Sequence, residues 1–362
     1  MTRCPTCGTS YGDEARFCTK DGTRLVAAVA PRTAAAPPSA GRAPAGTPPS
    51  AVKDATNVAA TNATAPVTEM IGHVLQGRYK ILKKLGEGGM SYVYLAEDAA
   101  NGNTTYAIKV LSPALSNDEN AMARLRREAD LGGRLEHANI CHIIGVGETP
   151  EHLVYIVMPY IEGEILADRT HRAGQLPPDE VVRWVNDISA GLERAHELQI
   201  VHRDLKPENI MLVAEDGGRD RAVVMDFGLA KERRAEGQLA KLTATGIILG
   251  TPEFMSPEQI RGKQLDARSD IYALGIVAFE MFTGKLPFQG RNAQEMMIAR
   301  LRGQPQKLRQ LRPDASEGLE KVLARAMDSN PDARYNTTLE FAEALTPSGE
   351  GGFLSKIKEK LK

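Results

Sequence analysis

The chain has 362 residues, of which 42% are hydrophobic and 25% charged, and its formal net charge at pH 7 is −1. These values are typical of an ordinary globular protein, and so small a net charge supplies no general attraction for nucleic acid or for a membrane surface. No apolar run reaches the roughly 18 residues that a membrane-spanning helix requires, and Cys and charged residues stand where a signal peptide would be apolar. We therefore expect a cytoplasmic protein with one large domain and appendages.

Three of the four cysteines lie in residues 1–25. Cys4 and Cys7 form a Cys-x-x-Cys-Gly turn, and Cys18 begins a second turn in which Asp21 stands where a fourth cysteine would be. This segment resembles half of a zinc ribbon, which makes Cys4, Cys7, Cys18 and Asp21 the predicted Zn²⁺ ligands. A metal-free remnant and a redox Cys-x-x-Cys are the alternatives. A segment this short would need the metal to fold.

Residues 26–69 are rich in Ala, Pro and Thr and predict a disordered linker, because they contain too few large apolar side chains to offset the conformational entropy. Residues 347–362 form a basic tail whose apolar residues share one helical face. Such a pattern is typical of a helix that binds a membrane surface or the groove of a partner. The alternative is a plain docked or frayed tail, because so short a helix is only marginally stable by itself. Nucleic-acid binding is disfavoured, because the N-terminal segment lacks a basic stripe with aromatic residues.

From Tyr79 the pattern changes to short strands. Tyr79–Leu85 and Ser91–Asp98 alternate apolar and polar residues around a glycine-rich turn, and Asn101-Gly102 marks the hairpin to Thr104–Val110. Leu153–Met158 is a continuous apolar run that predicts a buried strand.

Farther along, Pro178–Leu198 carries an apolar stripe of helical period, in which Trp184 is expected to pack in a core. Ile210–Val213 and Arg221–Met225 predict a second hairpin, which would bring Asn209 and Asp226 together.

Four motifs follow one another in a fixed order. They are the glycine-rich run 86–93, Ala107-Ile108-Lys109, the stretch Val201-His-Arg-Asp-Leu-Lys-Pro-Glu-Asn209, and Asp226-Phe-Gly228. Each motif alone is a weak signal, but their order is the one that phosphoryl transfer by protein kinases uses. From about Tyr79 to about Ala344, the chain resembles the eukaryotic-like serine/threonine protein kinases of bacteria.

The resemblance implies an α+β, bilobal protein-kinase fold over residues 70–346. The N-lobe, about 77–158, would hold a five-stranded antiparallel sheet and a helix C over Asp118–Leu135, and the C-lobe, about 162–346, would be mainly helical. Cys141 is expected to be a small buried hydrophobe in this N-lobe rather than a reactive thiol.

The same resemblance implies roles for the motif residues. Asn209 and Asp226 would hold Mg²⁺ (or Mn²⁺), and Lys109 would bind the ATP phosphates. Asp204 would orient the substrate hydroxyl and accept its proton, while Lys206 would neutralise the γ-phosphate.

Glu128 would hold Lys109 in place. At the glycine-rich turn a serine replaces the third glycine, but the remaining glycines still let backbone N–H groups approach phosphate. Pro159 lacks an N–H, which the adenine contact does not use, since that contact needs the Pro159 carbonyl and the Ile161 N–H. The remaining residues expected around ATP are Leu85, Gly86, Glu87, Gly88, Gly89, Val93, Ala107, Met158 and Met211.

Through Lys206 and the run Gly250-Thr-Pro-Glu-Phe-Met-Ser-Pro-Glu258, the resemblance also implies serine or threonine of a protein as the acceptor, with Thr251 bonding Asp204 and Lys206. Thr243 and Thr245 are predicted autophosphorylation sites whose phosphate Arg203 would receive, which implies self-association for the transfer. Two solvated loop threonines are the alternative. A nucleotide-binding scaffold and a kinase of small molecules remain competing functions.

Structural roles are expected for four further side chains. Glu258 and Arg334 would form a buried ion pair, Asp270 would cap the backbone of the catalytic loop, and His202 would be a packed core histidine.

Overall fold

The computed structural model describes residues 2–3, 10–11, 70–88, 91–102, 104–117, 122, 135–227 and 252–346. The chain divides into two units, Met1–Asn62 and Ala63–Lys362. In the first unit, β1 (Thr2–Arg3) pairs antiparallel with β2 (Ser10–Tyr11). The predicted zinc ligands, the linker 26–69 and the tail 347–362 lie outside the described residues.

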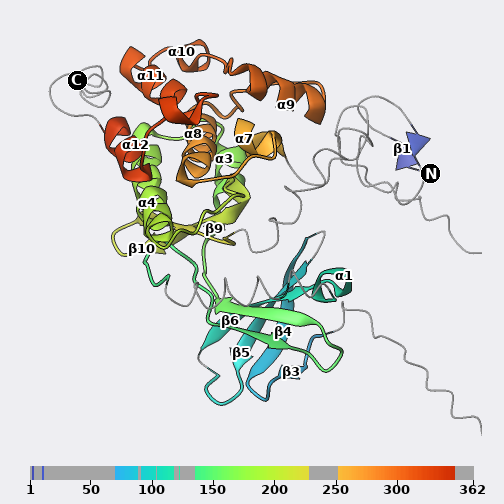
Figure 1. Ribbon diagram of the computed structural model, residues 1–362. Coiled ribbons are helices and arrows are strands. Elements are labelled where there is room, and N and C mark those ends of the chain that lie inside the picture. The colour runs from blue at the N-terminus through green and yellow to red at the C-terminus, as the bar shows by residue number, and fades with distance from the viewer. Residues whose placement is uncertain are drawn as a thin grey trace, which may run out of the picture. The chain divides into compact units, whose positions relative to one another are not determined.

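The N-terminal part of the second unit is an antiparallel sheet with the strand order β3-β4-β5-β6-β8-β7. The expectation of five strands is wrong for the described residues, because the sheet has six. Its strands, visible in the lower part of Figure 1, are β3 (Val74–Leu75), β4 (Tyr79–Gly88), β5 (Ser91–Asp98), β6 (Thr105–Leu111), β7 (Gly145–Glu148) and β8 (Val154–Pro159).

The additional strand is β3, and a tight turn accounts for it. Gln76 and Gly77 have φ angles of 50° and 67°, and the Arg78 N–H donates to the Leu75 carbonyl oxygen at 3.0 Å. Positive φ at both central residues is the signature of a type I′ hairpin turn, which pairs two strands directly. The short strand precedes the region where alternation begins, so the period-2 pattern does not reveal it.

The other strands follow the sequence pattern closely. β5 has the predicted range, while β6 begins one residue later than expected and β8 runs one residue further, to Pro159. Ile81, Tyr94 and Ile108 bury their side chains on one face of the sheet. Of the predicted helix C, only Met122 and Leu135 are described, so that prediction lies outside the described residues.

The C-terminal part of the second unit is mainly helical, as the resemblance implies. Its helices are α3 (Leu166–Ala173), α4 (Pro178–Glu197), α7 (Pro257–Ile260), α8 (Ala267–Thr283), α9 (Ala293–Arg302), α10 (Leu308–Leu311), α11 (Glu317–Ala326) and α12 (Thr338–Leu345). The single helical turn α1 (Pro113–Ser116) belongs instead to the N-terminal part, where it follows β6. Among the described helices, none combines the length and apolar composition that crossing a bilayer demands.

Helix α8 forms the centre of this part, because its side chains are buried on nearly every face from Ser269 to Phe279. A helix that is apolar all round belongs in a core, and α4, α11 and α12 contact it (Figure 1). On α4 the predicted stripe is buried, and Trp184 packs in the core as expected. Its indole N–H donates to the Asp220 carbonyl oxygen at 3.0 Å, which satisfies the one polar atom of the ring.

A second sheet of three strands lies in the helical part. β10 (Ile210–Glu215) pairs with β11 (Arg219–Val224) as the predicted hairpin, and β9 (Glu164–Ile165) pairs with the other edge of β10. A parallel bridge between Ile140 and Val224 connects β11 to the segment before β7. The hairpin therefore ends beside the chain that enters the first sheet, where several motif residues are expected.

Candidate active site

The segment between α4 and β10 carries most of the predicted catalytic side chains, and Asp270 of α8 holds its backbone. The carboxylate of Asp270 is buried and accepts from the His202 N–H at 2.8 Å and from the Arg203 N–H at 2.9 Å. Arg203 has φ of +64°, a left-handed conformation that costs energy for a non-glycine residue and persists only when its surroundings fix it. The predicted capping role of Asp270 is confirmed.

Two further side chains fix this loop and were missed from the sequence. His196 Nε2 lies 2.7 Å from Asp270 Oδ2, and Gln259 Nε2 donates to the Arg203 carbonyl oxygen at 2.7 Å. Burial by itself would raise the pKa of Asp270, but the hydrogen bond and charge of His196 outweigh it, and the pKa lies below its usual value. Asp270 therefore remains an acceptor for the loop. His202 is fully buried and packs against Phe227, as predicted.

Asp204, Lys206 and Asn209 lie together at the end of the loop. Asn209 Nδ2 donates to the Asp204 carbonyl oxygen at 2.8 Å and lies 3.4 Å from Asp204 Oδ2. Lys206 Nζ is 3.8 Å from the same carboxylate oxygen. The Met225 N–H donates to the Asn209 carbonyl oxygen at 2.8 Å, so the segment that continues to Asp226 runs beside Asn209.

Lys109 of the large sheet meets Asp226 of the helical part. Lys109 Nζ lies 2.7 Å from Asp226 Oδ2, with side-chain exposures of 20% and 36%. An ion pair this exposed contributes about 0–1 kcal/mol to stability, so its significance lies in the placement of the two groups. Glu128, the predicted partner of Lys109, lies outside the described residues, as do Gly89 and Thr251.

The residues predicted around adenine form one apolar cluster. Ala107 and Met158 are buried, and Val93, Ile161 and Met211 pack against the same cluster. These five side chains come from β5, β6, β8, β10 and the segment after β8, so the fold brings together residues that are far apart in the sequence.

The glycine-rich turn lies at the end of β4. Gly86 pairs with Val93 and Gly88 pairs with Ser91, while Leu85 is one of the exposed large hydrophobic residues and Glu87 forms an ion pair with a neighbouring lysine. A Cβ added at Gly86 would meet no atom of the described residues within 4 Å.

Cys141 is buried beside the segment that follows β8. Burial raises the pKa of its thiol to about 12, so the group stays protonated and unreactive, in agreement with its prediction as a small buried residue. Its Sγ lies 3.9 Å from the Pro159 carbonyl oxygen. A thiol is a weak donor, so this carbonyl retains capacity to accept from a ligand.

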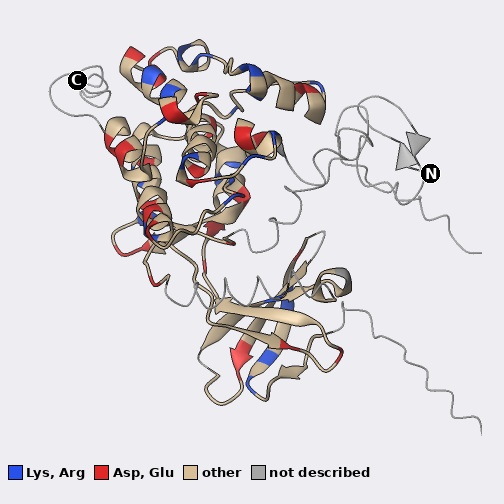
Figure 2. Ribbon diagram, viewed as in Figure 1, with Lys and Arg blue, Asp and Glu red and all other residues tan. Residues whose placement is uncertain are grey.

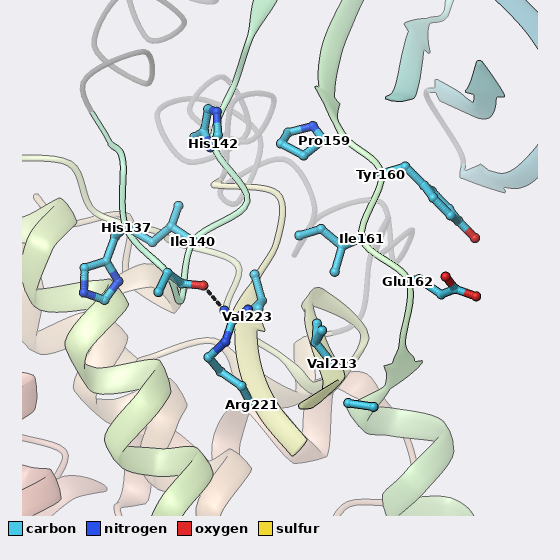
Figure 3. A pocket seen from close by; sticks show the side chains of 12 residues that line it. His137, Ile140, His142, Pro159, Tyr160, Ile161, Glu162, Val213, Arg221 and Val223 are labelled. Carbon is cyan, nitrogen blue, oxygen red and sulfur yellow. Dashed lines mark hydrogen bonds between the residues drawn. The ribbon is translucent and has the colours of Figure 1, made fainter. Parts of the chain in front are cut away.

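A cavity of about 590 Å³ also borders the segment after β8 (Figure 3). Pro159 and Ile161 line it, and Ile161 points toward Val213 and the cavity, whereas Tyr160 and Glu162 point away. Among the described lining residues, none is predicted to contact phosphate or Mg²⁺, whereas Pro159 and Ile161 are the predicted adenine contacts.

Glu258 and Arg334 form the predicted buried ion pair. The guanidinium donates to the two carboxylate oxygens at 2.7 and 2.8 Å, and Ser269 Oγ donates to Glu258 Oε1 at 2.7 Å. Burial would raise the pKa of Glu258, but the hydrogen bond and charge of Arg334 outweigh it and lower the pKa. The pair connects α7 to the loop before α12.

The residues predicted to bind Mg²⁺ offer the oxygen ligands that this ion prefers, a carboxylate from Asp226 and an amide from Asn209. Among the described residues, no group of three or more His, Cys, Asp or Glu side chains could hold a metal by itself.

The acidic and basic residues of the described chain are mixed over both the sheet and the helices, as Figure 2 shows. A continuous stripe of one sign, which nucleic-acid binding favours, is not visible in this view of the described chain.

Comparison with known proteins yields a coherent group of relatives. The protein kinase domain family matches residues 79–345. The serine/threonine-protein kinase pkn3 of Myxococcus xanthus is 37% identical over 284 residues, which cover 78% of this chain and 52% of that protein. The serine/threonine-protein kinase PrkC of Bacillus subtilis (strain 168) is 38% identical over 268 residues, 74% of this chain and 40% of that protein. The chain thus spans about half or less of the length of these relatives.

A solved structure extends the similarity to the fold. The kinase domain of Mycobacterium tuberculosis PknI aligns with a TM-score of 0.60 and 30% sequence identity, covering 76% of this chain and 97% of that one. Rad53 residues 1–466, solved in complex with AMP-PNP, align with a TM-score of 0.61 at 24% identity, over 74% of this chain and 66% of that one.

Proposed function

Because the chain belongs to the protein kinase domain family, we propose that it is a serine/threonine protein kinase that transfers the γ-phosphoryl group of ATP to protein hydroxyls in bacterial signal transduction. The single observation that carries the proposal is the meeting of Lys109 and Asp226 at 2.7 Å. Phosphoryl transfer needs charged groups to converge on one nucleotide, and here a lysine of the sheet and an aspartate of the helical part converge.

Each motif residue has a role in this proposal. Asp226 and Asn209 would hold Mg²⁺ (or Mn²⁺), and the bound ion would neutralise charge on the nucleotide phosphates. Lys109 would grip the α- and β-phosphates. Asp204 would orient the acceptor hydroxyl and take its proton, and Lys206, 3.8 Å from Asp204, would offset the charge of the transferred group.

The acceptor is proposed to be Ser or Thr, on the resemblance that Lys206 and the segment 250–258 carry, with Thr251 closing the site around a small alcohol. Activation is proposed to follow autophosphorylation at Thr243 or Thr245, in a transient complex of two copies. These threonines lie outside the described residues. The test is a Thr243→Ala/Thr245→Ala double variant, whose full activity would refute their regulatory role.

Incorporation of labelled phosphate into a generic basic protein tests the proposed activity. Wild type should label the protein, and Asp204→Asn should abolish labelling while leaving ATP binding and thermal unfolding nearly unchanged. Equal labelling by both proteins would refute the role of Asp204. ATP binding without labelling by wild type would favour the nucleotide-binding scaffold instead.

Two proposals concern the rest of the chain. A cytoplasmic location remains a proposal from the sequence, and in that compartment the clustering of Cys4, Cys7 and Cys18 favours a metal over disulfides. Zinc binding by these thiolates with Asp21 is tested by metal analysis of the full chain, in which a Cys4→Ser/Cys7→Ser variant should lose one equivalent of zinc.

A further inference from the structure

The cavity of about 590 Å³ lies where three segments meet (Figure 3). They are the chain before β7, the segment 159–162 after β8, and the hairpin β10–β11. Apolar side chains form much of its wall, namely those of Ile140, Pro159, Ile161, Val213 and Val223. Its volume falls within the range of about 300–1,000 Å³ that is usual for binding pockets. An apolar wall of this size suits an apolar occupant.

The described chain leaves this wall partly open. Ile161 and Val213 are only half-buried. Arg221, which also lines the cavity, is already engaged, because its guanidinium donates to Glu215 Oε1 at 2.5 Å and to the Ala138 carbonyl oxygen. An anionic ligand would have to compete for this guanidinium, whereas an apolar ligand leaves both hydrogen bonds intact.

The basic tail 347–362 carries a matching apolar face. At about 100° per residue its apolar side chains share one side of a helix, with lysines over much of the rest. Anchors at this spacing are the ones with which an amphipathic helix binds an apolar groove. A helix this short is only marginally stable by itself, so burial of its anchors would supply the stability that it lacks. The anchors are Phe353, Leu354, Ile357 and Leu361.

The end of α12 is close enough for the tail to reach the cavity. At the start of that helix Thr338 Oγ1 donates to the Ser189 carbonyl oxygen at 2.9 Å, and nearby on α4 the Asp187 carboxylate accepts from the Ala222 N–H at 3.0 Å. Ala222 adjoins a lining residue. Each hydrogen bond joins residues whose Cα atoms are less than about 8 Å apart, and α12 is about 12 Å long, so the end of α12 lies within about 35 Å of Ala222 in any orientation. Six extended residues followed by ten helical ones also span about 35 Å.

The cavity also borders the segment expected to contact adenine. Pro159 and Ile161 line it, and the Pro159 carbonyl and the Ile161 N–H are the predicted adenine contacts. An occupant that packs against Ile161 would restrict the motion of this segment. A restricted segment loses less conformational entropy when a nucleotide binds, so the affinity for nucleotide should rise.

We propose that residues 353–361 dock in this cavity as an amphipathic helix of the same chain and thereby hold residues 159–162 in place for the nucleotide. Glu162, which is exposed and points away from the cavity in Figure 3, would pair with a lysine on the outer face of the helix. The docking is independent of the proposed kinase function, whereas the effect on nucleotide binding rests on it.

Photo-crosslinking within the full chain tests the docking. A photoreactive benzoylphenylalanine at position 357 should link to peptides that contain residues 137–142, 159–162 or 213–223, identified by mass spectrometry. The same group at position 359, on the opposite face of the helix, should give few of these links. Ala214→Trp, which places a large side chain at an exposed lining position, should remove most of the links, and Ala214→Ser should keep them. Leu361→Asp removes an anchor outside the described fold and should have the same effect as Ala214→Trp.

Three outcomes overturn the docking. They are links from position 357 only to other parts of the chain, links that join two chains, and links that survive both Ala214→Trp and Leu361→Asp. Co-sedimentation with phosphatidylserine vesicles that Leu361→Asp abolishes, in the absence of links to the cavity, would assign the tail to a membrane surface instead.

Titration calorimetry with ATP and Mg²⁺ tests the effect on nucleotide binding. Leu361→Asp should raise the Kd for ATP about two- to fivefold, and Glu359→Gln, the matched variant on the opposite face, should leave it unchanged. Lost links with an unchanged Kd overturn the effect on the nucleotide and leave the docking intact. Failure of the wild type to bind ATP contradicts the proposed kinase function, and the crosslinks still decide the docking.

Discussion

Replacing Glu280 with glutamine should make the protein more stable above pH 7. Burial first, and then the charges of Glu208 and Glu253, raise the pKa of this carboxyl from 4.5 to about 7 in the folded protein. An acid with a raised pKa binds its proton more tightly when folded, so its contribution to stability falls as the pH rises from about 4.5 to about 7. At about 1.4 kcal/mol per pH unit, ionisation costs the fold about 3 kcal/mol above pH 7. Because the side chain is not fully buried, we expect a gain of about 1–3 kcal/mol for glutamine, which carries no charge.

Urea denaturation of wild type and Glu280→Gln at pH 5, 6, 7 and 8 measures this difference. The gap in the free energy of unfolding should be small at pH 5 and should widen up to pH 8, with an unchanged dependence on urea concentration. Glu295→Gln is the matched control, because a hydrogen bond from Arg291 lowers the pKa of Glu295, and its gap should not change between pH 5 and pH 8. Equal stability of wild type and Glu280→Gln at pH 8 would refute the reasoning, since it would mean that the carboxylate is well solvated or already paired.

Three further substitutions test the machinery around the active site. Lys109→Met should lower kcat by at least about 100-fold in the phosphate-labelling assay, because it removes a charge aimed at the phosphates, and should leave the melting temperature nearly unchanged. Asp270→Asn should lower the free energy of unfolding in urea by about 1–3 kcal/mol and should lower kcat, because an amide offers one acceptor oxygen where the carboxylate offers two. Unaltered activity would argue against the role of Asp270 in fixing the loop. Glu258→Gln should destabilise by about 3–5 kcal/mol, and adding Arg334→Met should restore part of that loss, whereas additive losses would contradict a coupled pair.

The sequence was most informative where short-range chemistry dictates structure. The hairpins β4–β5 and β10–β11 follow from alternation and turn residues, and the helical stripe that contains Trp184 predicts which face of α4 is buried. Motif spacing places Asp204, Asn209 and Asp226 in one neighbourhood, because a hairpin with a short turn returns the chain to its starting point. Local rules were sufficient for these features.

Contacts between segments that are distant in the sequence were harder to predict. His196 lies 74 residues from its partner Asp270, and within α4 it occupies a position that any helix-forming residue could fill. Glu208, Glu253 and Glu280 line one cavity, and their convergence depends on how η1 (Pro207–Asn209), η2 (Pro252–Phe254) and α8 pack, which no sequence periodicity reveals. Each glutamate alone is indistinguishable from a solvated surface residue. Strand β3 was not predicted for a local reason, because two residues are too few to show an alternation of apolar and polar side chains.

Helix α8 supports the catalytic loop near its first turn and lines a cavity with its last turn. Near its first turn Asp270 holds the backbone of the catalytic loop, and Ser269 donates to Glu258 of the buried ion pair. In its last turn Glu280 lines a cavity together with Glu208 and Glu253. Because α8 is buried along nearly its whole length, it cannot shift at one end without disturbing the packing of the other. A substitution that loosens α8 at its last turn should therefore also weaken phosphoryl transfer in the labelling assay, because the backbone of the catalytic loop depends on Asp270 of the same helix.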